Sequence, residues 1–526
     1  MKRLWRDPDW LIALGLFVFA LGLRAFMLVA YPFDGLYGQD AYAYYDYAGQ
    51  MRDSLIRGQS LPAFFWPLGY PLHIVAAMAI VGAQSLAGQI VSVIAGALIS
   101  PLTFALAHEA LLQIDPHRAR RAGVIAGLIV AVAGQLMISS LSVMSDATGL
   151  AWATASAWLT LRYARTLRPG TLALAAFTLS IAVITRWVFG LLALPWAICV
   201  LLAWRRSWAS VGLPRGFMLG VMVVAIGGSI VGTQLLLGES HTGDLQVVGW
   251  DLSNAFRSTA INSDGTFKYP MPIGLFYAQP LIHPAFLFPL LAPLWLVGLW
   301  SLAPHLHRAA RGSAQVQMLA RSLLASGLGL GRTDSPTGAL LIGWPLVVYG
   351  FLAGIAWESA RFPLAFFPPL AVWAGLGFDR IWEDRSTWRR GLSALTTIAV
   401  VGAFVWSMRV VNNFVLQNKN ANLARAQRIV EQLPRGTHVI TFGLTMTLRR
   451  YTDLDAIEIY TETPATLADR VCGRDAVYLY LDVANIEQQW AGLAPEINTR
   501  WLRDGPGLEM IDQFEGYTLF KVGSDC

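Results

Sequence analysis

Carboxylate and tyrosine side chains gather in one short segment, Asp40–Ala48 (DAYAYYDYA). If this segment is helical, Asp40, Tyr44 and Tyr47 lie on one face, at positions i, i+4 and i+7. Aromatic rings stack on the apolar faces of sugars, and carboxylates accept hydrogen bonds from hydroxyl groups. The pattern predicts a sugar-binding wall. An amphipathic helix whose tyrosines anchor it at a membrane surface would have the same pattern, and both interpretations stay open.

A second carboxylate and three arginines are further candidates. Asp146 (SVMSDA) follows one apolar run and begins the next, so it is either a helix N-cap or a second acid of the same site. Arg186 and Arg361 border apolar runs and have the right shape to bind a lipid phosphate, although ordinary anionic head groups would also suit them. Arg24 lies inside the first apolar run, where charge is costly and usually functional, unless its side chain extends to the head groups.

Long apolar runs organise most of the chain, and a membrane-spanning helix needs about 20 such residues. We predict about eleven spans: Trp10–Ala30, Leu86–Ala107, Gly123–Leu141, Ser142–Leu161, Thr171–Thr185, Val188–Trp204, Gly216–Leu237, Ala285–Leu302, Gly338–Trp357, Phe362–Phe378 and Gly391–Met408. The run Pro71–Ala83 is too short to span and is expected to form an interfacial or re-entrant helix. The run after Met1–Trp10 is too long for a signal peptide, so we expect it to remain as the first span.

Basic residues alternate between the loops, as the positive-inside rule requires. One set of segments holds Lys2, Arg3, Arg6, Arg118, Arg120, Arg121, Arg162, Arg165, Arg168, Arg205, Arg206, Arg215, Arg308, Arg311, Arg321, Arg332, Arg380, Arg385, Arg389 and Arg390. The other set holds only Arg52, Arg57, Arg186, Arg257, Lys268 and Arg361. This alternation predicts a multi-pass protein of the cell membrane with a cytoplasmic N-terminus and a C-terminal region outside the cytoplasm.

The composition changes after Met408, which predicts two domains. Residues 1–410 form an all-α transmembrane domain with a first outer loop at 31–70 and a long outer loop at 238–284. Residues 411–526 form a small α/β domain, because strand-like and helix-like segments alternate there. The expected strands are Thr437–Gly443, Ala456–Tyr460, Ala476–Val483 and Tyr517–Val522, and the expected helices are Leu444–Tyr451, Thr466–Val471 and Asn485–Arg503. This tail has no phosphate-binding glycine loop, so we expect it to pack or to recognise an acceptor.

Bulk composition excludes some classes of protein. Only 14% of the 526 residues are charged, against about 25% in soluble domains. The net charge of +6 lies in short loops between apolar runs, which argues against a nucleic-acid partner. Cys199 lies in an apolar run. Cys472 and Cys526 are either free thiols or, outside the cytoplasm, a disulfide.

Four motifs in order resemble a known family. They are GQDAYAYYDYA, the stretch FWPLGYPLHIVAAMAIVGAQSLAGQIVSVIAGAL, the outer turn SDA and the late run ARFPLAFFPPLAVWAG. This order is similar to the GT-C superfamily of lipid-dependent glycosyltransferases, on the branch that holds protein O-mannosyltransferases and bacterial aminoarabinose-type transferases. The resemblance covers most of Trp10–Met408.

The resemblance implies roles for individual residues. Asp40 would be the base toward an acceptor hydroxyl or amine, Asp146 would help to bind substrate or a metal, and Arg361 would contact the phosphate of the lipid donor. Family members often have an Asp-Glu pair at the first position, but here Ala41 follows Asp40. A divalent metal therefore stays an open possibility, with Asp34 or Asp46 as a partner acid.

The expected function is transfer of a sugar from a polyprenyl-phosphate donor to a protein, lipid or glycan acceptor by one inverting displacement. No other cofactor is expected. The donor phosphate is expected at Arg361, Arg186 and Arg24, and the acceptor or sugar at Tyr44, Tyr47, Asp46, Trp66, Tyr70 and His283. Trp250, Tyr269 and Tyr277 of the long outer loop are expected to help choose the acceptor. A transporter or flippase is the alternative, but the sequence has no repeat and few charges inside its apolar runs. A second alternative is a membrane subunit without catalytic activity.

Overall fold

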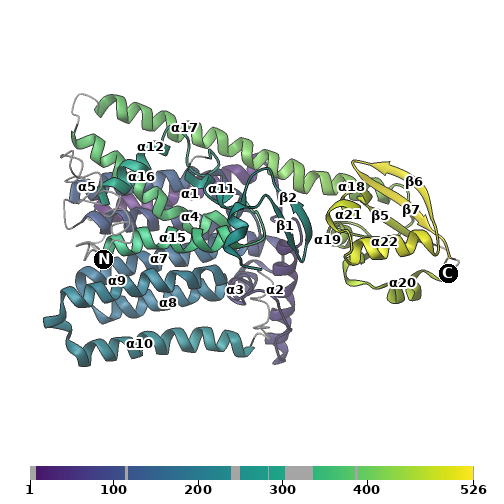
Figure 1. The fold of residues 1–526 in the computed structure, drawn as a ribbon, viewed down its shortest axis with the longest axis horizontal. Coiled ribbons are helices and arrows are strands. Elements are labelled where there is room, and N and C mark those ends of the chain that lie inside the picture. The colour runs from purple at the N-terminus through teal and green to yellow at the C-terminus, as the bar shows by residue number, and fades with distance from the viewer. Residues whose placement is uncertain are drawn as a thin grey trace.

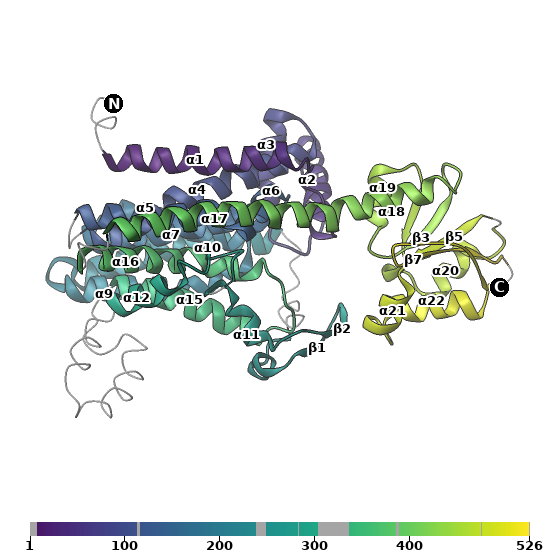
Figure 2. The same cartoon turned by 90° about the horizontal axis from the view of Figure 1, so that it is seen from above.

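The structure, a computed structural model, describes residues 8–112, 116–237, 249–281, 283–302, 336–384, 389–474 and 476–524. It consists of a long bundle of roughly parallel helices with a small α/β tail at one end (Figure 1). Helix α1 begins at the end of the bundle that is far from the tail (Figure 2). The two-part architecture expected from the sequence is thus present.

The bundle is built from helices that match the predicted apolar runs. Their bounds are α1 Pro8–Ala30, α4 Ser85–Leu111, α5 Pro116–Val132, α6 Gly134–Leu141, α7 Ser145–Thr166, α8 Pro169–Thr185, η2 Trp187–Leu192, α9 Ala193–Arg206, α10 Trp208–Leu237, α12 Ala292–Leu302, α15 Pro336–Gly354, η7 Phe362–Phe366, α16 Phe367–Asp384 and α17 Arg389–Phe414. Helices α4 and α16 lie near the middle, and 94% of the most apolar window in Phe362–Trp382 is buried. Small residues allow close packing of α12 on α16, since Gly298 of α12 lies against the backbone of α16 and Gly377 of α16 lies against the backbone of α12.

The chain is a multi-pass membrane protein. Seven of the described helices are long and apolar enough to cross a membrane, or eight if α5 and α6, which meet at 58°, form one broken span. The other three predicted spans are helices too, but α8 has 17 residues, α12 has 11, and α7 carries Asp146, Arg162 and Arg165. The count of about eleven stays a prediction.

The tail end of the bundle carries several short elements. They are α2 Asp40–Arg57, α3 Gly69–Val81, η4 Leu252–Phe256, the antiparallel hairpin of β1 Thr259–Asn262 and β2 Gly265–Lys268, α11 Ile273–Tyr277 and η5 Gln279–Leu281. Helix α3 is the short apolar helix expected near Pro71–Ala83, and it begins two residues earlier. All of these elements lie between the bundle and the tail or beside that boundary (Figures 1 and 2).

The opposite end of the bundle holds ion pairs between basic and acidic residues. Arg118 and Arg121 bind the buried carboxylate of Asp379 at 2.9 and 2.7 Å, and Arg165 pairs with Glu109. The predicted inner segments that contain these arginines therefore lie at the end of the bundle that is far from the tail. Eight of the basic residues used in that prediction lie outside the described residues: Lys2, Arg3, Arg6, Arg308, Arg311, Arg321, Arg332 and Arg385.

The tail is a five-stranded sheet in the order β4-β3-β5-β7-β6. Its elements are β3 His438–Thr441, α19 Thr445–Tyr451, β4 Asp455–Glu458, η10 Ile459–Thr461, α20 Pro464–Val471, β5 Val477–Leu481, α21 Val483–Gln489, α22 Ala494–Asp504, β6 Leu508–Phe514 and β7 Tyr517–Val522. Strands β4, β3 and β5 are parallel because helices connect them, whereas β7 is antiparallel to both of its neighbours. The sequence predicted four of the five strands.

Two predictions for the tail were incomplete. The helix expected over Asn485–Arg503 is two helices, because the chain turns at Gly492, which has φ +78°. Strand β6 was missed because its exposed edge lacks the apolar alternation of a half-buried strand. Cys472 is disulfide-bonded and Cys199 is free and buried, while Cys526 lies outside the described residues.

One continuous helical run joins the bundle to the tail. Helix α17 passes through a π-helical turn, η9 Val415–Asn420, into α18 Ala421–Val430 (Figure 2). The predicted domain boundary at residue 410 falls within this run, and the position of the boundary stays a prediction. The tail also contacts α2 and the β1–β2 hairpin, so three connections hold it above the end of the bundle.

Candidate functional site

Four charged residues meet at the tail end of the bundle, each at the end of a helix. Asp40 is the first residue of α2, and Asp146 lies in the first turn of α7. Arg186 follows the last residue of α8, and Arg361 precedes η7. The backbone dipoles favour an acid at a helix N-terminus and a base at a C-terminus, which suits Asp40, Asp146 and Arg186. Arg361 precedes a helix, so the dipole does not favour its charge and its ion pair with Asp40 has to offset this.

The four residues form two ion pairs. Arg361 Nη2 donates to Asp40 Oδ2, and Arg186 Nη1 donates to Asp146 Oδ1. The Asp146 side chain is almost fully buried, at 3% exposure, and its Oδ2 has no hydrogen-bond partner. Burial alone would lower the pKa of Arg361, but the carboxylates of Asp146 and Asp40 raise it. The Arg361 guanidinium therefore remains charged.

Phe362 keeps the two arginines close together. The guanidinium carbons of Arg186 and Arg361 lie 5.3 and 5.5 Å from the centre of its ring. A cation over an aromatic face is stabilised by the ring quadrupole. Two positive groups that flank one ring are well placed to bind a dianionic or monoanionic phosphate between them.

The loop that leads to Asp40 is held against the α6–α7 corner. Gln89 of α4 donates to the carbonyl oxygens of Phe33 and Leu141, both at 2.8 Å. The Val143 N–H donates to the Gly35 carbonyl at 2.9 Å, and Gly35 has φ +82° with no room for a side chain. These bonds fix the start of α2 beside the start of α7.

Two cavities open on either side of the Asp40–Arg361 pair. The first has a volume of about 200 Å³ and is lined by Asp40, Tyr44, Trp66, Pro67, Met144, Ser145, Arg186, Trp187, Val188, Arg361 and Phe362. The second has a volume of about 520 Å³ and is lined by Tyr37, Gly38, Gln39, Asp40, Gln135, Ile138, Met144, Ser359, Ala360, Arg361, Phe414 and Asn418. Asp40, Met144 and Arg361 are common to both, so they form the wall between the cavities.

Most of the charged residues predicted for the site meet there, but of the three predicted tyrosines only Tyr44 lines a cavity. Tyr44 lines the first cavity and its hydroxyl lies 3.2 Å from Ser145 Oγ, while Trp66 packs on Tyr44 with 5.3 Å between ring centres. Tyr47 donates to the Pro62 carbonyl and stacks on a phenylalanine. Tyr70 lies behind Tyr44 and bonds to Gly88 and Ser92. Tyr47 and Tyr70 therefore pack behind the residues that line the first cavity and do not line it themselves.

Three predicted site residues lie elsewhere. Asp46 is exposed and faces the arginines of α19. His283 accepts a hydrogen bond from the Ala285 N–H at 3.2 Å and lines neither cavity. Arg24 is fully buried against Gly96 and Ser140, and its Nη1 donates to the Ala20 carbonyl. Arg24 thus neither extends to a head-group layer nor joins the two other arginines.

Two alternative interpretations are settled by these contacts. Met144, not Asp146, is the N-cap of α7, so Asp146 is placed by its ion pair. Asp34 is not a partner acid of Asp40, because it binds Lys419 at 2.9 Å and accepts a bond from Tyr451. Among the described residues, no three His, Cys, Asp or Glu side chains come together in a way that would hold a metal. Each carboxylate at the site is paired with an arginine. Carboxylates in such pairs form a poor donor set for a divalent cation.

The long outer loop supports the segment before Arg361; residues 238–248 of this loop lie outside the described residues. Trp250 donates to the Phe351 carbonyl at 3.0 Å, and Tyr277 donates to the Trp357 carbonyl at 2.6 Å. The effect of the long outer loop on the choice of acceptor stays a prediction.

Several lining residues were not predicted from the sequence. Phe362 and Ser145 adjoin predicted residues, so a wider reading of the SDA and ARF motifs would have found them. Gln135, Phe414 and Asn418 gave no signal, because each lies in or beside an apolar run and reaches the cavity only through the bend at α6 and the π-helical turn.

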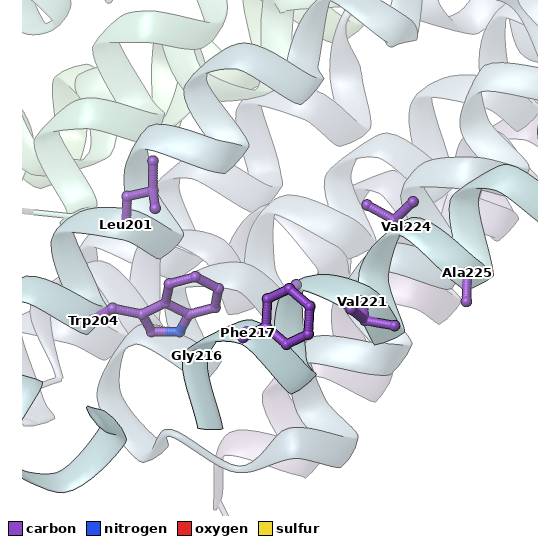
Figure 3. Close-up of a pocket in the computed structure, with 8 residues that line it drawn as sticks. Leu201, Trp204, Gly216, Phe217, Val221, Val224 and Ala225 are labelled. Carbon is purple, nitrogen blue, oxygen red and sulfur yellow. The ribbon is translucent and has the colours of Figure 1, made fainter. Parts of the chain in front are cut away.

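A third cavity has a different character. It is an apolar groove of about 720 Å³ between α9 and α10, lined by Leu201, Trp204, Gly216, Phe217, Gly220, Val221, Val224 and Ala225 (Figure 3). Helix α9 begins beside Arg186 and runs away from it, so this groove lies toward the other end of the bundle. It is separate from the charged site.

Comparisons with known proteins match this architecture. No family model matches the chain, and no curated protein sequence matches it. Among solved structures, ArnT from Cupriavidus metallidurans bound to undecaprenyl phosphate is 12% identical, with a TM-score of 0.57 over 98% of this chain and 97% of that one. ArnT in the apo state gives a TM-score of 0.60. The archaeal oligosaccharyltransferase AglB from Archaeoglobus fulgidus, in complex with an inhibitory peptide and a dolichol-phosphate, is 12% identical with a TM-score of 0.54, over 97% of this chain and 74% of that one.

The chain has a GT-C fold. At 12% identity the comparison establishes the fold and leaves the chemistry to the site. The GT-C fold expected from the four sequence motifs is confirmed, and the match extends through the α/β tail.

Proposed function

We propose that this protein is a membrane glycosyltransferase that moves a sugar from a polyprenyl-phosphate donor to an acceptor at the outer face of the membrane. One observation carries the proposal. An acid and a base, Asp40 and Arg361, form a wall between two cavities at the tail end of a GT-C bundle. In a transfer reaction the donor and the acceptor must meet at one point, and residues that line two adjoining cavities lie at such a point.

The smaller cavity suits the donor phosphate. It has two guanidinium groups, Arg186 and Arg361, against one lining carboxylate, and aromatic side chains surround them. Guanidinium groups bind phosphate oxygens with two parallel hydrogen bonds. The isoprenoid tail would lie in the bilayer. ArnT and AglB, which have this fold, are solved with undecaprenyl phosphate and a dolichol-phosphate, respectively.

The reaction is a single displacement. The acceptor oxygen forms a bond to the anomeric carbon, and the bond from that carbon to the phosphate oxygen breaks. The acceptor proton passes to the Asp40 carboxylate, and the electron pair of the broken bond stays on the departing polyprenyl phosphate. Arg361 and Arg186 offset the charge that grows on that phosphate. The configuration at the anomeric carbon inverts.

Arg361 also controls the state of Asp40. The Asp40 oxygen that accepts the hydrogen bond from Arg361 is occupied while the ion pair holds. The donor phosphate competes with Asp40 for the same guanidinium. Arrival of donor would therefore release Asp40 to accept the acceptor proton, so the base becomes active only when donor is present.

The test uses the full-length protein in liposomes with undecaprenyl-phosphate-linked hexoses and pentoses. Asp40→Asn should lower transfer by about 10²- to 10⁴-fold, the contribution of a general base, while undecaprenyl phosphate still binds. Asp53→Asn is the matched control, because Asp53 lies on the same helix in a surface ion pair with Arg52. Full transfer by Asp40→Asn would remove Asp40 as the base. Failure of the unsubstituted protein to bind undecaprenyl phosphate or to release sugar from any of the donors would overturn the proposal.

A further inference from the structure

The larger cavity beside Asp40 is lined by neutral groups. Of the residues that line it, Asp40 and Arg361 are the charged ones, and they are paired with each other. The lining of this cavity therefore carries no net formal charge, whereas the lining of the smaller one also includes Arg186, whose partner Asp146 does not line it. Its volume of about 520 Å³ lies within the range of about 300–1,000 Å³ that is usual for ligand sites.

The polar side chains of this cavity have unused hydrogen-bonding capacity. Within the described part of the chain, the side chains of Gln39, Gln135 and Ser359 and the Tyr37 hydroxyl make no hydrogen bond to the protein. Asn418 donates from Nδ2 to the Phe414 carbonyl at 3.0 Å, which leaves its Oδ1 open. Primary amides offer both donors and acceptors, and so do hydroxyl groups. Such a lining matches a ligand that is itself rich in hydroxyls.

An aromatic wall completes the cavity. Tyr37 and Phe414 meet edge to face with 4.6 Å between ring centres, and Phe33 packs on both. Burial raises the pKa of Tyr37 to about 12, so its hydroxyl is a neutral donor at physiological pH. Aromatic faces beside amides form a surface that fits both the apolar and the polar faces of a sugar ring.

The π-helical turn η9 is the device that builds one side of the cavity. Within it, Asn418 reaches the cavity, while the neighbouring Lys419 is buried and binds Asp34 and the Leu36 carbonyl. Single π-turns are frequent at functional sites, because the extra residue redirects side chains. Here the turn places an amide at the site and fixes it to the loop that leads to Asp40.

We propose that this cavity binds an uncharged glycan and presents one of its hydroxyl groups to Asp40. This inference rests on the proposed function, and it names the acceptor class for that reaction. A phosphate or another anion fits poorly, because this cavity, unlike the smaller one, has no cation beyond the one paired with Asp40. The acceptor is thus recognised by hydrogen bonds and ring contacts, and the donor by charge.

The test offers three acceptors to the liposome-reconstituted, full-length protein: a neutral fluorescent hexose oligosaccharide, a Ser/Thr-containing peptide and a phosphate monoester lipid. Transfer should go to the oligosaccharide. Gln135→Leu and Asn418→Leu should each lower kcat/KM for the oligosaccharide by roughly tenfold, the effect of one lost hydrogen bond with its partner left unsatisfied. Undecaprenyl phosphate binding should be unchanged in both variants.

Matched controls come from the same helical run. Gln417→Leu and Asn413→Leu replace the same residue types at exposed positions that do not line the cavity, and they should transfer normally. Transfer to the peptide or the phosphate lipid but not to the oligosaccharide would overturn the inference, and so would normal kcat/KM in both cavity variants. In either case, donor binding and sugar release would still stand, so the proposed function would survive. Loss of those two activities in the unsubstituted protein would instead sink the proposed function.

Discussion

Replacement of Arg186 by methionine separates two roles that the structure gives to one side chain. Arg186 neutralises the buried carboxylate of Asp146, and it is proposed to bind the donor phosphate. Methionine has a similar length without charge or donors. Loss of one partner from a buried ion pair costs about 3–5 kcal/mol, because the other charge is left uncompensated. The Arg186→Met variant should therefore unfold at a clearly lower temperature.

A double variant removes the first effect and keeps the second. In Arg186→Met/Asp146→Asn no charge is left buried, so the unfolding temperature should recover most of its loss. The phosphate contact stays absent, and a hydrogen bond to a charged group contributes about 1.5–3 kcal/mol. Affinity for undecaprenyl phosphate should thus remain lower by roughly 10- to 150-fold in the double variant.

The assays are thermal unfolding in detergent and equilibrium binding of fluorescent undecaprenyl phosphate, each on the unsubstituted, single and double variants. Asp146→Asn alone is the fourth corner of the cycle and isolates the coupling between the two side chains. If the double variant recovers full lipid affinity together with its stability, Arg186 acts only as the partner of Asp146, and the reasoning about the donor cavity is refuted.

Three further predictions concern other parts of the molecule. Burial raises the pKa of Glu358 from 4.5 to about 7, so the folded state binds this proton more tightly than the unfolded state does. The stability of the folded state should therefore fall as the pH rises from about 4.5 to 7. Glu358→Gln should remove that part of the pH dependence of the unfolding temperature. An identical pH profile in the variant would contradict this. Lys419→Met should speed hydrogen exchange in the loop that leads to α2, because the Lys419 side chain is 8% exposed and its Nζ lies 2.9 Å from Asp34; unchanged exchange would show that other contacts hold the loop. Gly298→Ala should lower the yield of folded protein, since its new Cβ would clash with the Trp373 carbonyl, and a normal yield would mean that α12 and α16 can move apart.

The order of the elements could be predicted from the sequence because its signals are local. The length of an apolar run sets whether a helix can cross a membrane, and the runs from Trp10–Ala30 to Gly391–Met408 all proved to contain helices. Four strands of the tail were found for the same reason, since burial within a sheet leaves apolar residues in a short continuous or alternating pattern. Strand β6 was missed because an exposed edge strand carries no such pattern.

The candidate site was predicted in part. Asp40, Asp146, Arg186 and Arg361 were found because charge is rare beside apolar runs, so each charged residue there is conspicuous. Tyr47 has the same helical spacing from Asp40 as a lining residue would need, yet its hydroxyl turns to Pro62. Periodicity gives the face of a helix, but the neighbours of that face come from other elements.

The sequence by itself determined which segments form apolar helices, and it marked the charged residues at their ends, because the hydrophobicity of a segment depends on its own side chains. Only the tertiary structure decided which charges meet. Asp40 and Arg361 are 321 residues apart, and their pairing depends on how α2, α7 and η7 converge. The second cavity likewise exists only because α6 bends away from α5 and a π-helical turn rotates Asn418 inward. Contacts of this kind depend on packing between distant segments, and no local pattern in the chain records them.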